Sequence, residues 1–472
     1  MSPNQASVTL QTAPAIAGLG REERLQFFLL LGLVAVCGGL MLYLWLPPWI
    51  ALAGALGLAG VILVFAYPFS ALYVLLCLFF FPMNLGEFTI VQAGGALTVF
   101  VALVSTLYRD RSLRAGPFLL PILCFGMVML LSLVYARFLN PVFGDLYRLF
   151  SNVLIYLLVL ILVNTPDRLR HILGAFLVAG ASNAVHGLYT SYVTGNTLDR
   201  AAGFVGNANR LGFICSFALP IAFHRFAEAE HRLHRYAYLA LCGVLFAGLT
   251  VSASRGATLA LLAGMLLCVY QIRRRPRLLI PVMLIAAVLL SLAPKVFFER
   301  VSNLSEDVEH SVEINKPQQL TSRGYLFKTS VRVWKDHPIW GVGVGNFGKY
   351  FITANYNPGW ERSKEMPQHN LYLHVLVENG VVGFLVFSWI LWRLGRLLLF
   401  MHRSAECPVS RRTREILNGV GGAAVVFAVM ALSMDFLYTH ELYILLSLVY
   451  LTSEQARKEI AFSSPLQRVY SS

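Results

Sequence analysis

Two arginine-containing clusters stand where long apolar stretches of the sequence begin. The segment from Arg200 to Arg210 (RAAGFVGNANR) directly precedes an apolar run, and Arg255 lies in the string SASRG between two such runs. An arginine at the edge of a membrane is costly unless it is paired or faces water, and guanidinium offers paired donors to phosphate oxygens. Turn chemistry accounts for the neighbouring glycines and asparagines, and snorkelling toward lipid headgroups is the alternative for the arginines. We expect Arg200, Arg210 and Arg255 to bind phosphate.

A third cluster follows in a polar segment of the second half of the chain. Arg323 lies in a stretch with helical spacing of apolar residues that ends before His337-Pro338, because proline disfavours helix in the residue before it. The string GVGVGN at 341–346 invites a dinucleotide interpretation. That interpretation fails because no strand precedes the string and no βαβ unit surrounds it. We predict an amphipathic helix, a tight turn with close backbone approach, and a loop-shaping role for His337.

A fourth cluster begins where the chain is expected to enter the membrane again. His369-Asn370 follows Pro367 and is followed, nine residues later, by Gly380 and Gly383. A single histidine is usually structural. Here, however, nearby arginines would lower the imidazole pKa and keep the ring neutral, which suits a general base. We therefore take His369 as the candidate catalytic residue.

Carboxylate pairs are missing from the same predicted face near any membrane boundary. The acidic run Glu306, Asp307 and Glu309 is far from every apolar stretch and is best explained as a solvated segment. A divalent cation would need oxygen ligands that this face does not offer. The sequence therefore predicts no metal and no cofactor.

Composition defines the elements that must position these residues. Hydrophobic residues make up 57% of the 472-residue chain and charged residues only 13%, about half of what a soluble domain carries. The net charge of +14 comes mainly from arginines in short loops, which indicates membrane orientation and not nucleic-acid binding. The long polar segment has no cysteine, so it has neither a disulfide framework nor a Cys/His metal spacing.

Fourteen apolar stretches are candidate membrane spans, and because hydropathy splits and merges short segments we predict 12–14 transmembrane helices. The stretches are 26–46, 49–67, 69–82, 90–108, 117–136, 149–164, 171–193, 211–226, 237–253, 255–272, 278–294, 380–401, 418–437 and 440–453. If they alternate, five arginine clusters fall on one side, which the positive-inside rule assigns to the cytoplasm. These clusters are Arg109/Arg111/Arg114, Arg168/Arg170, Arg225/Arg232/Arg235, Arg273/Arg274/Arg275/Arg277 and Arg403/Arg411/Arg412/Arg414.

The predicted organisation is that of an all-α polytopic membrane protein with one large, partly helical outer loop. Its parts are a cytoplasmic tail 1–25, a transmembrane bundle 26–293, the loop 294–368, C-terminal transmembrane helices 369–453 and a cytoplasmic tail 454–472. Both termini are then cytoplasmic. The segments that contain Arg200 and Arg210, Arg255, Arg323 and His369 face the opposite side.

At these residues the sequence resembles the O-antigen ligase and polymerase superfamily. His369, Asn370, Gly380 and Gly383 fit the ligase signature His-(Asn/Ser/Gln)-x9-Gly-x-x-(Gly/Thr/Val). The SRG turn at Arg255, the Arg323 helix and the stretch from His337 to Phe347 are similar to the rest of the shared pattern. The resemblance spans about residues 200–400 and the whole topology.

This resemblance implies a GT-C-like fold and glycan transfer at the periplasmic face of the bacterial inner membrane. The donor would be an O-antigen chain on undecaprenyl diphosphate, and the acceptor a sugar hydroxyl of lipid A–core, both reached from the membrane lipids. Arg255 and Arg323, with Arg200 and Arg210 as weaker candidates, would stabilise the departing diphosphate without metal. Attack on C1, with His369 as base, would invert the anomeric centre.

Three alternatives stay open. An O-antigen polymerase or a protein O-oligosaccharyltransferase would use the same chemistry with another acceptor. A transporter or lipid flippase would use Asp435, with His440 and Glu441, as a proton relay. Against transport stand the lack of a repeat in two halves and the gathering of the motifs on one face. Asp435 is equally well explained as the partner of an arginine.

Overall fold

The computed structural model describes residues 115–193, 200–291, 322–353 and 365–463, with short pieces at 69, 72, 76, 84–85, 88–89, 293–294, 297–298 and 356. Several predictions concern residues outside this set: the spans at 26–46, 49–67 and 90–108, most of 69–82, the arginines 109, 111 and 114, and the acidic run 306–309. The total of 12–14 spans therefore stays a prediction.

The described chain is helical apart from a two-residue hairpin, in which β1 (Asn84–Leu85) pairs antiparallel with β2 (Phe88–Thr89). Its principal helices are α5 (Leu119–Tyr135), α6 (Leu139–Leu162), α7 (Pro166–Leu188), α8 (Ala208–Glu228), α9 (Arg232–Ser252), α10 (Arg255–Gln271), α11 (Leu279–Ser291), α14 (Ser322–Asp336), α15 (Phe347–Phe351), α16 (Leu371–Ser404), α17 (Arg411–Met430) and α18 (His440–Ser463). A π-turn, Tyr189–Val193, extends α7. The predicted all-α class is confirmed.

Length and apolar composition make this a polytopic membrane protein. Six of the described helices are long and apolar enough to cross a bilayer: α6, α7 with its π-turn, α8, α9, α16 and α17. Large apolar side chains such as Val134, Leu266 and Leu284 point outward, where a bilayer and not water accounts for their exposure. The central helix is α8, which is buried over most of its length and packs against α7, α9, α10 and α17.

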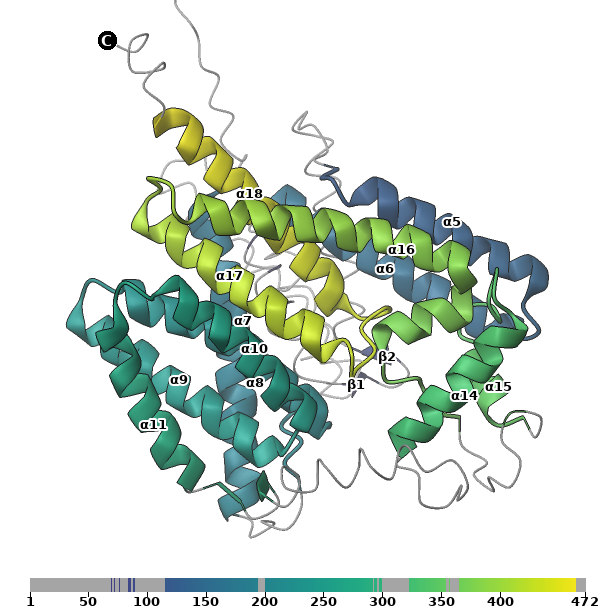
Figure 1. The fold of residues 1–472 in the computed structure, drawn as a ribbon, viewed down its shortest axis with the longest axis horizontal. Helices are drawn as coiled ribbons and strands as arrows, with labels where there is room; N and C mark the ends of the chain where they lie inside the picture. The colour runs from purple at the N-terminus through teal and green to yellow at the C-terminus, as the bar shows by residue number, and fades with distance from the viewer. Residues whose placement is uncertain are drawn as a thin grey trace, which may run out of the picture.

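The helices form two groups in Figure 1. Helices α7 to α11 lie together on one side, in teal, and α5, α6, α16 and α18 lie on the other. Helices α14 and α15 pack beside the first turns of α16, and α14 contacts it directly. The amphipathic helix predicted around Arg323 is confirmed as α14.

Four of the five arginine clusters gather at one end of the bundle. The carboxylate of Glu415 on α17 lies 3.2 Å from Arg170 on α7 and 3.3 Å from Arg225 on α8. Further pairs join Arg275 and Arg411 to Glu228, Arg412 to Asp167, and Arg273 to Glu406. The predicted sharing of one side by these clusters is thus supported by direct contacts.

Three element boundaries differ from those expected. Helix α6 begins at Leu139, so most of the loop expected at 137–148 is helical. Helix α16 begins at Leu371, close to the start of the C-terminal helices predicted at 369 but nine residues before the apolar stretch that begins at 380, and is kinked at Gly380. Helix α17 ends at Met430, which places Asp435 in the α17–α18 loop (Ala431–Thr439) and not in a membrane span. Hydropathy misses the first turns of α16 because their polar residues His374, Glu378 and Asn379 are buried by tertiary contacts.

Candidate functional site

The turn between α9 and α10 carries a strained residue beside Arg255. Ala253 has φ 45°, in the left-handed region that residues with a Cβ seldom adopt. The turn is held by Ala253 N–H donating to Thr250 O at 3.0 Å, and by Ser254 Oγ donating to Asn209 Oδ1 at 3.0 Å. Helix α10 begins directly after this turn, at Arg255.

Arg200 and Arg210 are both engaged in contacts that hold the helices together. Arg200 donates from Nε to Ser252 O at 3.0 Å and from Nη2 to Asn209 Oδ1 at 2.7 Å. Arg210 Nη2 lies 2.6 Å from Oε1 of the buried Glu441 on α18. These two arginines therefore stabilise the contacts between neighbouring segments of the bundle.

His369 is the second non-glycine residue of the described chain with a left-handed backbone, at φ 55°. It precedes the N-cap of α16, where Asn370 Oδ1 accepts from Leu373 N–H at 3.0 Å. The α17–α18 loop fixes this corner, because Asn370 Nδ2 donates to Leu432 O at 3.1 Å and Leu371 N–H to Ala431 O at 2.9 Å. Strained backbone of this kind concentrates at functional sites.

Two charged groups of opposite sign act on the His369 imidazole. Burial lowers its pKa, and the Arg323 guanidinium on α14 lowers it further, whereas the Asp435 carboxylate raises it. The net result is a pKa below the ordinary value, so the neutral ring predominates at neutral pH. The structure thus brings His369, Arg323 and Asp435 into one electrostatic unit, although 112 residues separate Arg323 from Asp435 in the sequence.

Asp435 continues into a chain of buried polar residues. Its Oδ2 is hydrogen-bonded to Nδ1 of His374, one turn into α16, and its Oδ1 accepts from Leu437 N–H at 3.0 Å. Nε2 of His374 lies 2.8 Å from Glu378 Oε2. Burial opposes the charged form of Asp435, but His374 and these hydrogen bonds hold its pKa below the usual range. The hydrogen-bonded partner of Asp435 is therefore a histidine, where the sequence had left an arginine as one alternative.

The glycine-rich turn predicted at 341–346 donates backbone hydrogen bonds to Glu378, the last residue of this buried polar series. Glu378 Oε2 accepts from Gly345 N–H at 2.7 Å, and Oε1 from Phe347 N–H at 3.2 Å. Gly341 has φ 75°, and a Cβ there would collide with the Glu378 backbone. Close backbone approach, and not phosphate binding, is what the glycines serve.

The signature glycines let α16 bend and pack. At Gly380 (φ 61°) a Cβ would collide with the Ile339 carbonyl, and past this kink Val381 N–H donates to Pro338 O at 2.9 Å. A Cβ on Gly383 would press on Asn379 and lie 3.6 Å from Val128 of α5.

His337 packs edge-on against Tyr350, at 5.5 Å between ring centroids. These positions shape the loop around the His369 corner.

Arg255 joins the same end of the bundle through its neighbour. A Cβ on Gly256 would clash with Ser433, which lies in the α17–α18 loop two residues before Asp435. The loop is anchored by Phe436, whose ring lies 4.7 Å from those of Phe213 and Phe427. The first turn of α10 and the His369 corner therefore both contact the loop that contains Asp435.

Comparison with known families identifies the segment that holds most of these residues. Residues 239–388 match the family model described as O-antigen ligase. This segment is similar to the O-antigen ligase family. The recognition made from the sequence is confirmed, and no curated protein matches the chain in a direct search.

The matched segment covers about a third of the chain and contains Arg255, Arg323 and His369. Members of this family are glycosyltransferase-like enzymes with lipid-linked glycan substrates. Asp435, with Arg200 and Arg210, lies outside the matched segment. The site is thus completed by helices on both sides of the domain.

Sequence reasoning missed His374 and Glu378. Both interrupt an apolar helix at a spacing of four residues, and ionisable residues within a span are functional candidates. That signal was present, but their link to Asp435 was not readable, since it depends on how α16 meets the α17–α18 loop. Among the described residues, no group of three or more His, Cys, Asp or Glu side chains is arranged to hold a metal ion.

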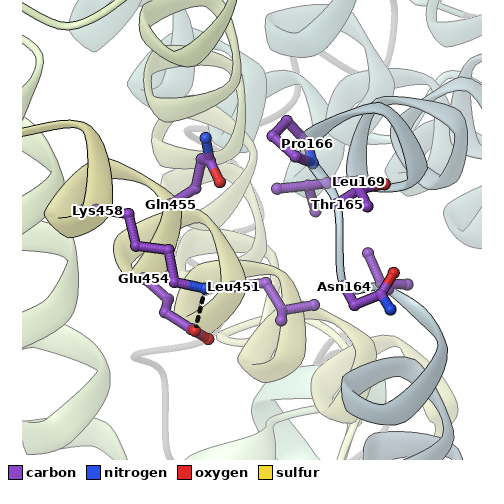
Figure 2. Close-up of a pocket in the computed structure, with 9 residues that line it drawn as sticks. Asn164, Thr165, Pro166, Leu169, Leu451, Glu454, Gln455 and Lys458 are labelled. Carbon is purple, nitrogen blue, oxygen red and sulfur yellow. Dashed lines mark ion pairs between the residues drawn. The ribbon is translucent and has the colours of Figure 1, made fainter. Parts of the chain in front are cut away.

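A small pocket far along α18 is a contrasting feature. Figure 2 shows it where the start of α7 meets α18, with Lys458 paired to Glu454 at 2.7 Å. Its α18 residues lie 10 or more positions after Glu441, or ~15 Å along the helix. It contains none of the predicted site residues.

Proposed function

We propose that this O-antigen ligase-family protein transfers a glycan from undecaprenyl diphosphate to a sugar hydroxyl of lipid A–core. His369 accepts the proton of the acceptor hydroxyl, and the hydroxyl oxygen attacks C1 of the donor sugar. The C1–O bond to the diphosphate breaks as the new glycosidic bond forms, so the anomeric centre inverts. The diphosphate leaves with the bonding electron pair, and no ATP is needed.

The observation that supports this proposal best is the environment of His369. His369 lies on a strained backbone at the entry to α16, and its lowered pKa keeps the ring neutral and able to accept a proton. Asp435, on the other side, stabilises the imidazolium that forms once the proton is taken. Arg323 thus favours the neutral imidazole that accepts the proton, and Asp435 favours the imidazolium that results.

The arginines supply the second half of the chemistry. Negative charge develops on the diphosphate as it departs, and fixed guanidinium groups stabilise it without reorganisation and without metal. Arg323 already acts electrostatically on His369, and Arg255 opens α10 beside the α17–α18 loop. We assign Arg255 and Arg323 to the diphosphate. Arg200 and Arg210 are secondary, because contacts to Asn209 and Glu441 engage them.

The site faces the periplasm in this proposal. The arginine-rich end, joined by Glu415, Glu228 and their partners, is the cytoplasmic end by the positive-inside rule, and the His369 corner lies at the other end of α16 and α17. Both termini are then cytoplasmic in the bacterial inner membrane, and lipid-anchored donor and acceptor reach the site laterally.

The lipopolysaccharide of a strain lacking this gene tests the acceptor. A ligase predicts lipid A–core without polymer, with the polymer retained on undecaprenyl diphosphate. Loss of the polymer itself would instead identify a polymerase, and unchanged lipopolysaccharide with unglycosylated protein an oligosaccharyltransferase. Either of these two outcomes would overturn the acceptor assignment while leaving the chemistry in place.

A further inference from the structure

A second polar cavity lies at the arginine-rich end of the bundle, away from the proposed transfer site. It has a volume of about 520 Å³ and lies between α7 and α9, with Arg225 of α8 among its lining residues. The three helices pack against one another, as Figure 1 shows. Its polar lining comprises Asp167, Arg170, His171, Arg225 and Tyr238.

The charge balance of this cavity favours an anion. Arg170 and Arg225 share the single carboxylate of Glu415, and the carboxylate of Asp167 is already paired with Arg412. Three guanidinium groups thus face two carboxylates. The Arg225 side chain is only 10% exposed; its Nε lies 3.3 Å from Glu415 Oε1 and its Nη2 donates to Arg170 O at 2.7 Å. Nε of Arg170 has no hydrogen-bond acceptor among the described residues, and a buried donor of this kind calls for one.

The other half of the cavity is apolar and open to the side of the bundle. Gly174, Leu177, Val178 and Ala181 continue the same face of α7 beyond Arg170, and Val178 is 51% exposed. Gly174 keeps the passage open, because a Cβ there would meet only Nη1 of Arg225 within 4 Å, at 3.9 Å. From Arg170 to Ala181 the groove runs for ~16 Å along the helix.

We propose that this cavity binds an anionic phospholipid, with the phosphate between Arg170 and Arg225 and an acyl chain along the α7 groove. A free anion would use the arginines but not the apolar wall. A neutral lipid would use the wall but leave one positive charge uncompensated. Basic pockets between transmembrane helices are suited to anionic headgroups, and the volume suits a headgroup with the first part of its chain.

The test is lipid retention by the purified full-length protein, measured by native mass spectrometry with phosphatidylglycerol and phosphatidylcholine in competition. We expect a preference of about tenfold for phosphatidylglycerol. Gly174→Leu should remove the preference by filling the groove, with all charges intact. The matched control is Gly144→Leu on α6, where a Cβ meets nothing within 4 Å. It should behave as wild type.

Further arms separate the lipid from a free anion and from a folding defect. Inorganic phosphate at millimolar concentration should not displace the lipid, and Arg170→Gln, which keeps the Arg225–Glu415 pair, should weaken the preference at unchanged thermal stability. Displacement by phosphate would show a free-anion site and overturn the proposal. Equal retention of the two lipids by the wild type, or an unchanged preference in Gly174→Leu, would overturn it as well.

Discussion

The two polar ends of the helix bundle use arginine in opposite ways. At the arginine-rich end, Glu415, Glu228, Asp167 and Glu406 each pair with one or two arginines, and the described backbone is unstrained. At the other end lie both left-handed non-glycine residues, Ala253 and His369, directly beside predicted site residues. There a histidine, and not an arginine, binds the central carboxylate Asp435. The arginine-rich end is held together by ion pairs, whereas the other end holds two residues with strained backbone and a buried histidine–carboxylate pair.

The largest effect on stability should come from the carboxylate that two arginines share. Glu415 is 9% exposed, and Glu415→Ala leaves Arg170 and Arg225 without it. We expect a loss of ~3–5 kcal/mol in the free energy of unfolding. Glu406→Ala, which removes a carboxylate that is 59% exposed, should cost at most ~1 kcal/mol. Unfolding in mixed micelles measures both, and equal losses would mean that the arginine-rich end is not held together by Glu415.

The arginines assigned to the diphosphate should matter for rate and not for folding. Arg255→Ala and Arg323→Ala should each slow transfer by ~10²–10³, since each removes a fixed donor to the departing charge. Lysine should rescue only in part, because it lacks the paired donors. Arg210→Ala, which leaves the buried Glu441 unpaired, should instead reduce the level of folded protein. Near-wild-type rates in the first two variants would remove the diphosphate from their roles.

A smaller effect is expected at the kink that shapes the site end. Gly380→Ala forces a Cβ into the Ile339 carbonyl at φ 61°, at a cost of ~1–3 kcal/mol. Gly395→Ala in the same helix meets nothing within 4 Å, and should be neutral or stabilising by up to ~1 kcal/mol. Thermal unfolding of the two variants checks this, and equal midpoints would show that the kink is relaxed.

The finest test is the pH dependence of transfer. Because the His369 pKa is lowered, the ring is neutral at neutral pH and the rate should fall only as the pH drops through that pKa. Arg323→Gln removes a charge that lowers the pKa, so the acid limb should move to higher pH. Asp435→Asn removes a charge that raises it, so the limb should move to lower pH. The measurement is the residual transfer rate of each variant across the acid pH range. A shift of the acid limb in the same direction in both variants would contradict the assignment of His369 as base.

Much of this organisation was predictable from the sequence. Apolar length predicts the membrane helices, the arginines predict a shared side, proline predicts the helix end before His337, and the glycines predict the turn at 341–346. Three features were not predictable: the left-handed backbone of His369, the partner of Asp435, and the engagement of Arg200 by Asn209. Each is set by particular backbone and side-chain contacts, and hydropathy carries no information on those contacts.

The central claim is that His369 is the base and that His337 shapes the loop. The most direct measurement is single-turnover glycan transfer by His369→Ala and His337→Ala at matched levels of folded protein, with donor binding assayed separately. We predict that His369→Ala binds donor and loses ~10²–10⁴ in rate, whereas His337→Ala, deprived of its contact with Tyr350, loses thermal stability and retains transfer. Normal turnover by His369→Ala, with a folded but inactive His337→Ala, would assign the base to the other histidine and contradict the account.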